Sequence, residues 1–463
     1  MSGIEGTGAC ARASPPMNGI RVEVERTADE AQVRLWSIDA VVERELRVPG
    51  HQSWLDLYEQ AAAVFGLPVP HARRAPSPRP AAAALRPLLT DAVDPRILYG
   101  YGDPAVLWDE GRWRLAVTSN DAPDIFPLLS SRDLQSWRLD GFAFEEPPPW
   151  ALTGAGSDFW APELHRVGDE VWLLFAARKK PDGELAIGLA RAPSAIGPFV
   201  PDPEPLVEGG VIDPHLVVDD QGRAHLIWKE DRNDRWPPLV ARLLLGGGEE
   251  GRRLFPTSTG REGARVAAEL WRALQPLGPM ETFFALQPLI EAATEDFPGF
   301  RARLATVDHP LAREALSACA TRILGQPLTT DGGLTGEPRL VLENDQAWEA
   351  HLIEGVWITR REGRWWALYA GNDFSTERYG IGVAVADHPL GPYAKAPEPL
   401  LTSSADRTGP GHPSVASGAD GVPRLFLHAF QPGRTGYKAF RALLTAELEV
   451  RNGWLAVKAQ RPS

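Results

Sequence analysis

A unit of strand, glycine turn and strand recurs from about residue 99 onward, and this repeat restricts the fold more than any other feature. Each copy begins with a distinctive residue before an apolar strand, and a turn containing glycine leads to a second apolar strand. The five copies begin at Asp103-Pro104, Trp160-Ala161-Pro162-Glu163, Asp213-Pro214, Glu354-Gly355 and Gly411-His412. Since repeated units of about four short strands are typical of propeller blades, the sequence predicts an all-β, five-bladed β-propeller over residues 99–463.

Residues 261–324 interrupt the third unit and lack the strand alternation of the rest. Alanine, leucine and glutamate recur there at helical spacing, which predicts a helical insertion in the third blade. An insertion of this length belongs at the rim of a propeller. There it covers a cleft, offers a docking surface, or serves only packing or oligomer contacts.

The residues before the repeat divide into three segments. Residues 1–17 show no periodic pattern, and we expect them to be disordered. Residues 18–70 alternate as strands and then show helical spacing around residues 54–65, which predicts a small α+β unit. Residues 71–98 are rich in proline and alanine and are predicted to be a linker.

Composition excludes several classes of function. The formal net charge is −13 and no long basic stripe is present, so nucleic acid is not an expected partner. No apolar run approaches the roughly 18 residues of a membrane span, and the first residues lack the apolar core of a signal peptide. We therefore expect a cytoplasmic protein without a membrane partner. Two cysteines make no disulfide framework, and nothing in the sequence selects an oligomeric state.

Three acidic residues occupy matching places in three of the repeated units. The first strand of each blade lines the axis of a propeller, so residues at the starts of these strands converge at one mouth of the channel. Asp103, Asp213 and Glu354 are therefore expected to meet there. Proline after each aspartate removes a backbone donor and restrains the aspartate toward an extended conformation, which helps to aim the carboxylate.

These motifs, in this order, resemble glycoside hydrolase family 43, the five-bladed propeller glycosidases of arabinofuranosidase and xylosidase type. The resemblance covers about residues 99–450. It implies that Asp103 is the general base, that Asp213 orients the acid and adjusts its pKa, and that Glu354 is the general acid. Two signatures of the family match WAPE at residues 160–163 and GPGH at residues 409–412. One departure is Val356, where the family usually has proline.

The implied reaction explains why these residue types are needed. In the inverting geometry a water molecule fits between the sugar and the base, so the two carboxyl groups lie about 6.5–9.5 Å apart. Asp103 must be ionised, whereas Glu354 must keep its proton. An ionised Asp213 beside Glu354 would raise the pKa of Glu354 by like-charge repulsion.

Three further residues are predicted to bind substrate: Trp160 as a wall of the sugar pocket, Glu163, and His412. In many family members the GPGH histidine lies at the propeller axis beside a calcium ion or a water molecule. We therefore expect His412 to contact a structural calcium ion through water, because calcium prefers oxygen ligands. No cofactor is required for the chemistry itself.

The leading hypothesis is an inverting glycosidase that releases a terminal pentose, α-L-arabinofuranose or β-D-xylose, from small oligosaccharides or glycosides. One alternative is a carbohydrate-binding propeller without catalysis. Another is a retaining enzyme of a related five-bladed family, whose carboxyl groups would lie about 5–5.5 Å apart. A further alternative is a glycosidase or tailoring enzyme that acts on a galactoside or a glycosylated metabolite.

Overall fold

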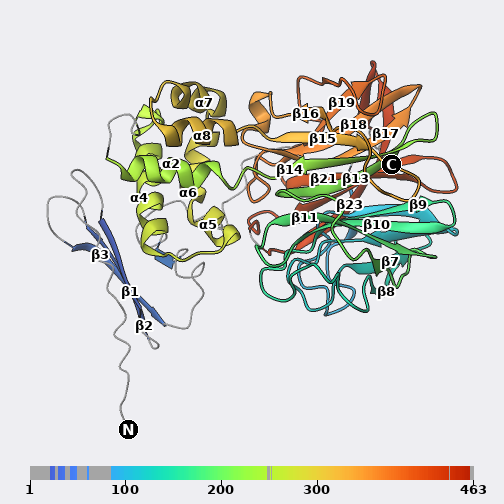
Figure 1. Cartoon of the computed structure of the whole chain (residues 1–463), viewed down its shortest axis with the longest axis horizontal. Coiled ribbons are helices and arrows are strands. Elements are labelled where there is room, and N and C mark those ends of the chain that lie inside the picture. The colour runs from blue at the N-terminus through green and yellow to red at the C-terminus, as the bar shows by residue number, and fades with distance from the viewer. Residues whose placement is uncertain are drawn as a thin grey trace, which may run out of the picture. The chain divides into compact units, whose positions relative to one another are not determined.

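The computed structural model describes residues 21–26, 30–36, 42–49, 60–61, 85–247, 251, 253–436 and 438–458. The chain divides into two compact units, each drawn in Figure 1. The first unit combines residues 1–70 with residues 234–318, and the second combines residues 71–233 with residues 319–463.

The second unit contains five antiparallel sheets, one for each repeated unit of the sequence. In the first four sheets every strand pairs with the next strand along the chain. The first sheet holds β5 (Ala105–Asp109), β6 (Arg112–Ala116), β7 (Pro127–Ser131) and β8 (Trp137–Phe142). The second holds β9 (Trp160–Val167), β10 (Glu170–Arg178), β11 (Leu185–Ala192) and β12 (Val200–Pro201).

The third and fourth sheets repeat this order. The third holds β13 (Val211–Val218), β14 (Ala224–Glu230), β15 (Arg322–Pro327) and β16 (Arg339–Glu343). The fourth holds β17 (Ile353–Arg361), β18 (Arg364–Gly371), β19 (Gly380–Ala386) and β20 (Ala394–Lys395), and the short 3-10 helix η1 (Ala347–Glu349) precedes it.

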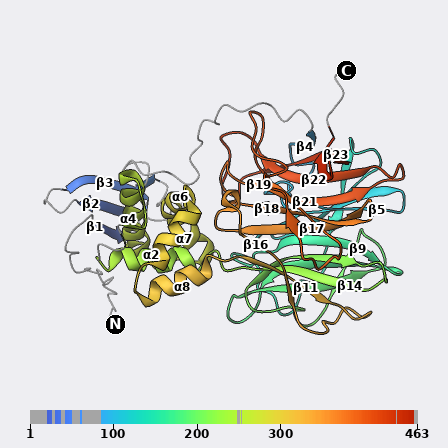
Figure 2. The same cartoon turned by 90° about the horizontal axis from the view of Figure 1, so that it is seen from above.

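The fifth sheet is completed by a strand from before the repeat. It holds β21 (Thr408–Ser417), β22 (Pro423–Phe430), β23 (Arg441–Arg451) and β24 (Trp454–Val457). Strand β4 (Arg86–Leu89) pairs with β23, and Figure 2 shows the two strands side by side. The linker predicted over residues 71–98 therefore ends before β4, because Leu89 is buried in the core of the propeller.

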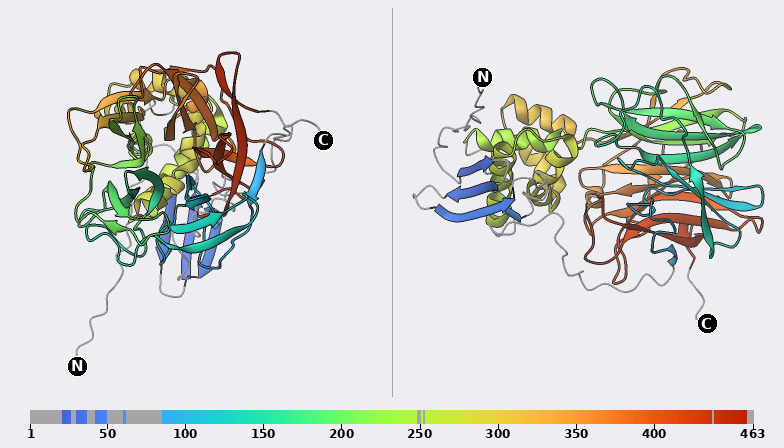
Figure 3. Two further views of the ribbon diagram at one scale, coloured as in Figure 1. Left: turned by 90° about the vertical axis from the view of Figure 1, so that its right-hand side faces the viewer. Right: turned by 90° about the horizontal axis from the view of Figure 1, so that it is seen from below.

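The five sheets surround a common axis and form the predicted five-bladed β-propeller. The inner strands β5, β9, β13, β17 and β21 each contact the next, and β21 contacts β5 in turn. Figure 3 (left) shows the sheets in an end-on view. Apolar side chains fill the spaces between neighbouring sheets. For example, Phe126, directly before β7, packs against Phe159, directly before β9, and against Phe175 of β10. The ring centroids are 5.7 and 5.6 Å apart.

The helical insertion lies between β14 and β15, within the third blade as predicted. Its helices are α2 (Trp236–Leu245), α4 (Ser258–Ala273), α5 (Pro279–Ala285), α6 (Gln287–Thr294), α7 (Phe297–Ala305) and α8 (Pro310–Ala318). The helices begin at Trp236, earlier than the predicted residue 261. The prediction missed α2 because Pro237 and Pro238 hide its helical pattern, although proline is tolerated in the first turn of a helix. They also end before residue 324, since Arg322 begins β15.

The first unit joins the N-terminal strands to this insertion. Strands β1 (Arg21–Arg26), β2 (Glu30–Trp36) and β3 (Val42–Pro49) form an antiparallel sheet, and α4 contacts β1. The predicted disorder of residues 1–17 lies outside the described residues, as does the helix predicted around residues 54–65 except at positions 60 and 61. In the described part of the chain, no helix has the length and apolar character needed to cross a membrane.

Candidate active site

Each inner strand carries one residue with a left-handed backbone near its start. These residues are Asp103, Ala161, Asp213, Gly355 and His412, with φ between 45° and 55°. Four of them precede proline, yet Asp103 and Asp213 do not adopt the extended conformation that the proline was expected to favour. The strand pairing shifts register at these positions in the third, fourth and fifth blades, and such bulges re-aim side chains. All five residues line one axial cavity of about 10 Å³, which has room for about one water molecule.

Asp103 is held by donors from two blades. Arg441 Nη1 donates to its Oδ1 at 2.8 Å and Thr118 Oγ1 donates to its Oδ2 at 2.5 Å. The Nδ1 atoms of His412 and His428 each lie 3.4 Å from Oδ1. Burial opposes ionisation, but the charge of Arg441, aided by the Thr118 hydrogen bond, lowers the pKa of Asp103 well below its usual range. This carboxylate is therefore ionised near neutral pH, as a general base requires.

Two buried groups support this arrangement. The backbone N–H of Asp103 donates to His428 Nδ1 at 3.1 Å, and burial lowers the pKa of His428 well below its usual value. His428 is therefore neutral and acts as an acceptor. Thr118 Oγ1 also accepts a hydrogen bond from the backbone N–H of Ala161 at 2.8 Å. This bond ties the first blade to the second beside Asp103.

Glu354 is held through both of its carboxylate oxygens. Lys229 Nζ donates to Oε2 at 2.9 Å and the Tyr379 hydroxyl donates to Oε1 at 2.8 Å. Lys229 is 1% exposed, and its Nζ also lies 3.1 Å from Asp231 Oδ1. Burial would lower the pKa of Lys229, but the carboxylates of Asp231, Glu354 and Asp213 raise it overall, so Lys229 stays charged. Burial raises the pKa of Tyr379 well above its usual value, so its hydroxyl keeps the proton it donates.

Asp213 lies beside the Glu354 backbone. Its Oδ2 accepts a hydrogen bond from the backbone N–H of Gly355 at 2.8 Å. Burial, together with the charge of Glu354, raises the pKa of Asp213 to about 6. The sequence predicted that Asp213 acts on Glu354 as a like charge. The structure adds a direct link through Gly355 and a raised pKa of Asp213 itself.

His412 lies between the base and the strand that carries the acid. Its Nδ1 faces Asp103, and a Cβ added at Gly355 would lie only 2.8 Å from the same nitrogen. Gly355 therefore leaves the room that the His412 ring occupies. Val356, which follows Gly355 and stands where the family usually has proline, also lines the axial cavity.

The residues around His412 do not fit a calcium ion bound by side chains. Calcium takes about six to eight oxygen ligands, and the carboxylate of Asp103, 3.4 Å from His412 Nδ1, already accepts from Arg441 and Thr118. The described part of the chain places His412 in no cluster of three metal-ligating side chains. The predicted contact of His412 with a calcium ion through water stays a prediction.

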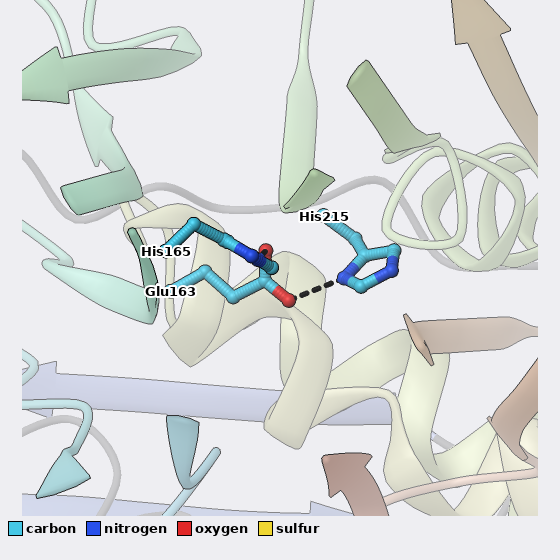
Figure 4. Close-up of side chains that lie close together, drawn as sticks. All are labelled: Glu163, His165 and His215. Atoms are coloured by element: carbon cyan, nitrogen blue, oxygen red, sulfur yellow. Dashed lines mark hydrogen bonds and ion pairs between the residues drawn. The ribbon is translucent and has the colours of Figure 1, made fainter. Parts of the chain in front are cut away.

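A second group of polar side chains lies on the inner strands β9 and β13. Glu163, His165 and His215 place their ligand atoms within 4.8 Å of one another, and Figure 4 shows the three side chains. His165 Nε2 lies 2.8 Å from Glu163 Oε2, and His215 Nδ1 bonds to Oε1. Burial opposes ionisation of Glu163, but the nearby His215 and His165 lower its pKa to about 2.

Hydrogen bonds explain this group without a metal. His215 Nε2 accepts from the backbone N–H of Ile358 at 2.9 Å and lies 3.3 Å from the backbone oxygen of Ile358. The shorter contact places the ring proton on Nδ1, which donates it to Glu163. A metal at Nδ1 would require the other tautomer. The backbone N–H of Leu216 also donates to Glu163 at 3.0 Å. Since both oxygens of Glu163 are engaged and the side chain is buried, we assign it to the channel wall instead of to substrate binding.

Trp160 begins β9 at the same end of the propeller as Asp103. Its Nε1 donates to Asn120 Oδ1 at 2.9 Å, and the Arg178 guanidinium lies 5.7 Å from the ring centroid. The indole is half-buried, so its orientation is fixed while part of it stays accessible. Its predicted role as a wall of the sugar pocket stays a prediction.

Several residues of this site were not identified from the sequence: Thr118, Lys229, Tyr379 and His428. Nor was Arg441 identified as the partner of Asp103. One signal was present, because Thr118 and Lys229 are polar residues near the end of a unit's second strand, where the chain returns to the axial mouth. Each follows an apolar run, so a polar side chain there is unexpected unless it faces the site.

The model of glycosyl hydrolases family 43 matches residues 94–242 and 312–455. The chain belongs to this family. The family consists of glycoside hydrolases, which confirms the predicted family and the predicted class of enzyme. The gap between the two matched segments, residues 243–311, falls within the helical insertion.

Individual relatives agree with this membership. The chain is 38% identical to xylosidase/arabinosidase 43A of Humicola insolens over 81 residues, which are 18% of this chain and 23% of the relative. A thermostable family-43 glycoside hydrolase matches with a TM-score of 0.56 and 24% identity over 79% of this chain and 95% of its own. An endo-1,4-beta-xylanase from Bacteroides thetaiotaomicron matches with a TM-score of 0.53 and 18% identity over 80% and 97%. These two similarities show the fold.

Proposed function

We propose that this family 43 chain is an inverting glycosidase that releases a terminal pentose from oligosaccharides or small glycosides. The observation that carries the proposal is the pair of separately held carboxylates at the axial mouth. Asp103 accepts from Arg441 and Thr118, and Glu354 accepts from Lys229 and Tyr379. The name of the Humicola insolens relative, xylosidase/arabinosidase, supports a pentose.

In the proposed reaction, Asp103 accepts a proton from a water molecule as the water oxygen attacks the anomeric carbon. Glu354 takes part in its protonated form and gives this proton to the glycosidic oxygen as the bond to the leaving sugar breaks, which leaves Glu354 as the carboxylate. The lowered pKa of Asp103 keeps the base ionised. Asp213 positions the acid through the Gly355 backbone.

The first test is hydrolysis of a panel of 4-nitrophenyl glycosides: α-L-arabinofuranoside, β-D-xyloside, β-D-galactoside and β-D-galactofuranoside. We expect turnover of a pentoside by the native protein and none by Asp103→Asn. Asp169→Asn, in the exposed turn after β9, is the matched control and should keep the native rate. Proton NMR of the first-formed sugar should show the inverted anomer, and retention would overturn the inverting mechanism.

A second variant separates the acid from the base. Glu354→Gln should lose activity most on natural oligosaccharides, whose leaving groups need protonation, and least on glycosides with good leaving groups. Equal losses on both substrates would contradict the assignment of Glu354. Sugar binding without turnover on the whole panel would instead support the carbohydrate-binding alternative, and turnover of a galactoside would replace the pentose.

A further inference from the structure

A second cavity lies in the propeller unit, away from the axial one. Its volume is about 700 Å³, which is within the range of about 300–1,000 Å³ that is usual for small-molecule sites. Its walls come from two segments of the chain. The lining residues are Thr90, Asp91, Ala92, Gln431, Arg434, Thr435, Ala439 and Phe440.

This cavity lies at the catalytic end of the propeller. Strand β4 runs antiparallel to β23, so β4 ends where β23 begins. Residues 90–92 follow β4 directly, and residues 431–440 lead directly into β23. The first residue of β23 is Arg441, whose guanidinium bonds to Asp103. Both walls of the cavity are therefore next to the segment that holds the general base.

Tyr101 connects the two walls. Its hydroxyl donates to the backbone oxygen of Asp91 at 2.9 Å and accepts from the backbone N–H of Val93 at 3.0 Å. The edge of its ring meets Phe440, with centroids 5.8 Å apart and planes at 89°. Tyr101 is fully buried and lies two residues before Asp103. The cavity is thus preformed, which lowers the entropic cost of binding.

The side chains around the cavity suit a neutral ligand with several hydroxyl groups. Arg434 and Gln431 are exposed, and their side chains make no hydrogen bond or ion pair with any described residue. Asp91 accepts from the Thr90 hydroxyl at 2.9 Å. The lining has no net charge, because it holds one cation and one anion beside an amide and two hydroxyl groups. The half-buried ring of Phe440 adds an apolar surface. Such a mixture of an aromatic ring and a few polar groups is typical of small-molecule sites.

We propose that this cavity is a leaving-group subsite that binds a sugar unit beyond the glycosidic bond that is cleaved. The inference rests on the proposed function, and it specifies the substrate as an oligosaccharide long enough to reach the cavity. Arg434 and Gln431 donate hydrogen bonds to hydroxyls of that unit. Phe440 contacts the apolar face of its ring.

The test compares two substrates with the same terminal sugar: the 4-nitrophenyl glycoside, and xylotriose or α-1,5-arabinotriose. Arg434→Ala and Gln431→Ala should each lower the ratio of kcat/KM on the trisaccharide to kcat/KM on the aryl glycoside by about 3- to 10-fold, the effect of one net hydrogen bond. Arg132→Ala is the matched control. Arg132 is an exposed arginine in the turn after β7, at the opposite end of the propeller, and its removal should leave the ratio unchanged.

An unchanged ratio in both cavity variants would overturn the inference while leaving the glycosidase proposal intact. If the native protein hydrolyses neither substrate, the proposed function fails, and calorimetric titration of both trisaccharides into the Asp103→Asn protein tests the cavity by itself. Binding that weakens about 3-fold or more on adding Arg434→Ala would support the subsite. Absent binding, or binding that Arg434→Ala leaves unchanged, would refute it.

Discussion

Replacing Asp213 by asparagine should change how the stability of the propeller depends on pH. Burial and the charge of Glu354 raise the pKa of Asp213 from 3.8 to about 6. The folded protein thus favours the protonated carboxyl group. Its contribution to stability is complete below about pH 3.8 and is lost as the pH rises through 6. Each unit of difference between the folded and unfolded pKa is worth about 1.36 kcal/mol, so the loss of stability reaches about 3 kcal/mol.

Asparagine cannot ionise, and its Oδ1 can still accept from the Gly355 N–H. The Asp213→Asn protein should therefore escape this loss. Thermal unfolding followed by tryptophan fluorescence between about pH 4 and pH 8 measures the difference in Tm between the variant and the native protein. At roughly 2 °C per kcal/mol, this difference should shift by about 6 °C in favour of the variant as the pH rises.

Asp219→Asn is the control for this experiment, since Asp219 is a buried aspartate of the same blade. Burial opposes its ionisation, but hydrogen bonds from Arg223 and His225 lower the pKa of Asp219. Its contribution is present above about pH 4 and is lost in more acidic solution, so the Tm difference for this variant should be flat from pH 5 to pH 8. A flat difference for Asp213→Asn as well would refute the argument that burial holds a proton on Asp213.

Three further predictions concern the supports of the two carboxylates. Lys229→Met should lower kcat by about 10-fold or more with a smaller effect on KM. It should also destabilise the fold by about 3 kcal/mol, because the largely buried carboxylates of Glu354 and Asp231 lose their cation. Steady-state kinetics and denaturant unfolding measure both effects, and a native kcat would contradict the role of the lysine. Gly411→Ala places a Cβ 1.8 Å from Tyr379 Cε1, so it should lower the free energy of unfolding by about 1–3 kcal/mol. It should also reduce kcat, because Tyr379 moves away from Glu354. A native Tm and a native rate would show that the ring is not held there. Because the pKa of Asp103 is held well below its usual range, kcat/KM on a glycoside with a good leaving group should show no acid limb from Asp103 above about pH 4. An acid limb above pH 4 that persists unchanged in Asp213→Asn would contradict this.

The convergence of the acidic residues could be predicted because it follows from a repeat. Asp103 and Asp213 each precede proline at the start of a unit, and the inner strands of successive blades contact one another. Alignment of the units alone therefore predicts that these carboxylates meet, without any knowledge of the distances between them. The glycine turns likewise predicted the number of blades, since each turn joins the first and second strands of a sheet.

The supporting residues were harder to predict, because their positions depend on how neighbouring blades are packed. Tyr379 lies in the segment before β19, and Arg441 begins the third strand of the last blade. Neither is at a repeated position, so alignment of the units gives no signal. The pairing of β4 with β23 joins segments far apart in the sequence, and proline-rich surroundings concealed that strand.

The fourth blade explains why the acid and the base have different supports. At the left-handed position the other blades place Asp103, Ala161, Asp213 and His412, whereas the fourth blade places Gly355 and carries its carboxylate one residue earlier. Glu354 is therefore supported by Lys229 and Tyr379 instead of by the groups that hold Asp103. Arg441 lowers the pKa of Asp103 while burial raises that of Asp213, so between about pH 4 and pH 6 Asp103 is ionised while Asp213, which positions the acid, still holds its proton. Environments that push pKa values apart in this way are what acid–base catalysis at one pH requires.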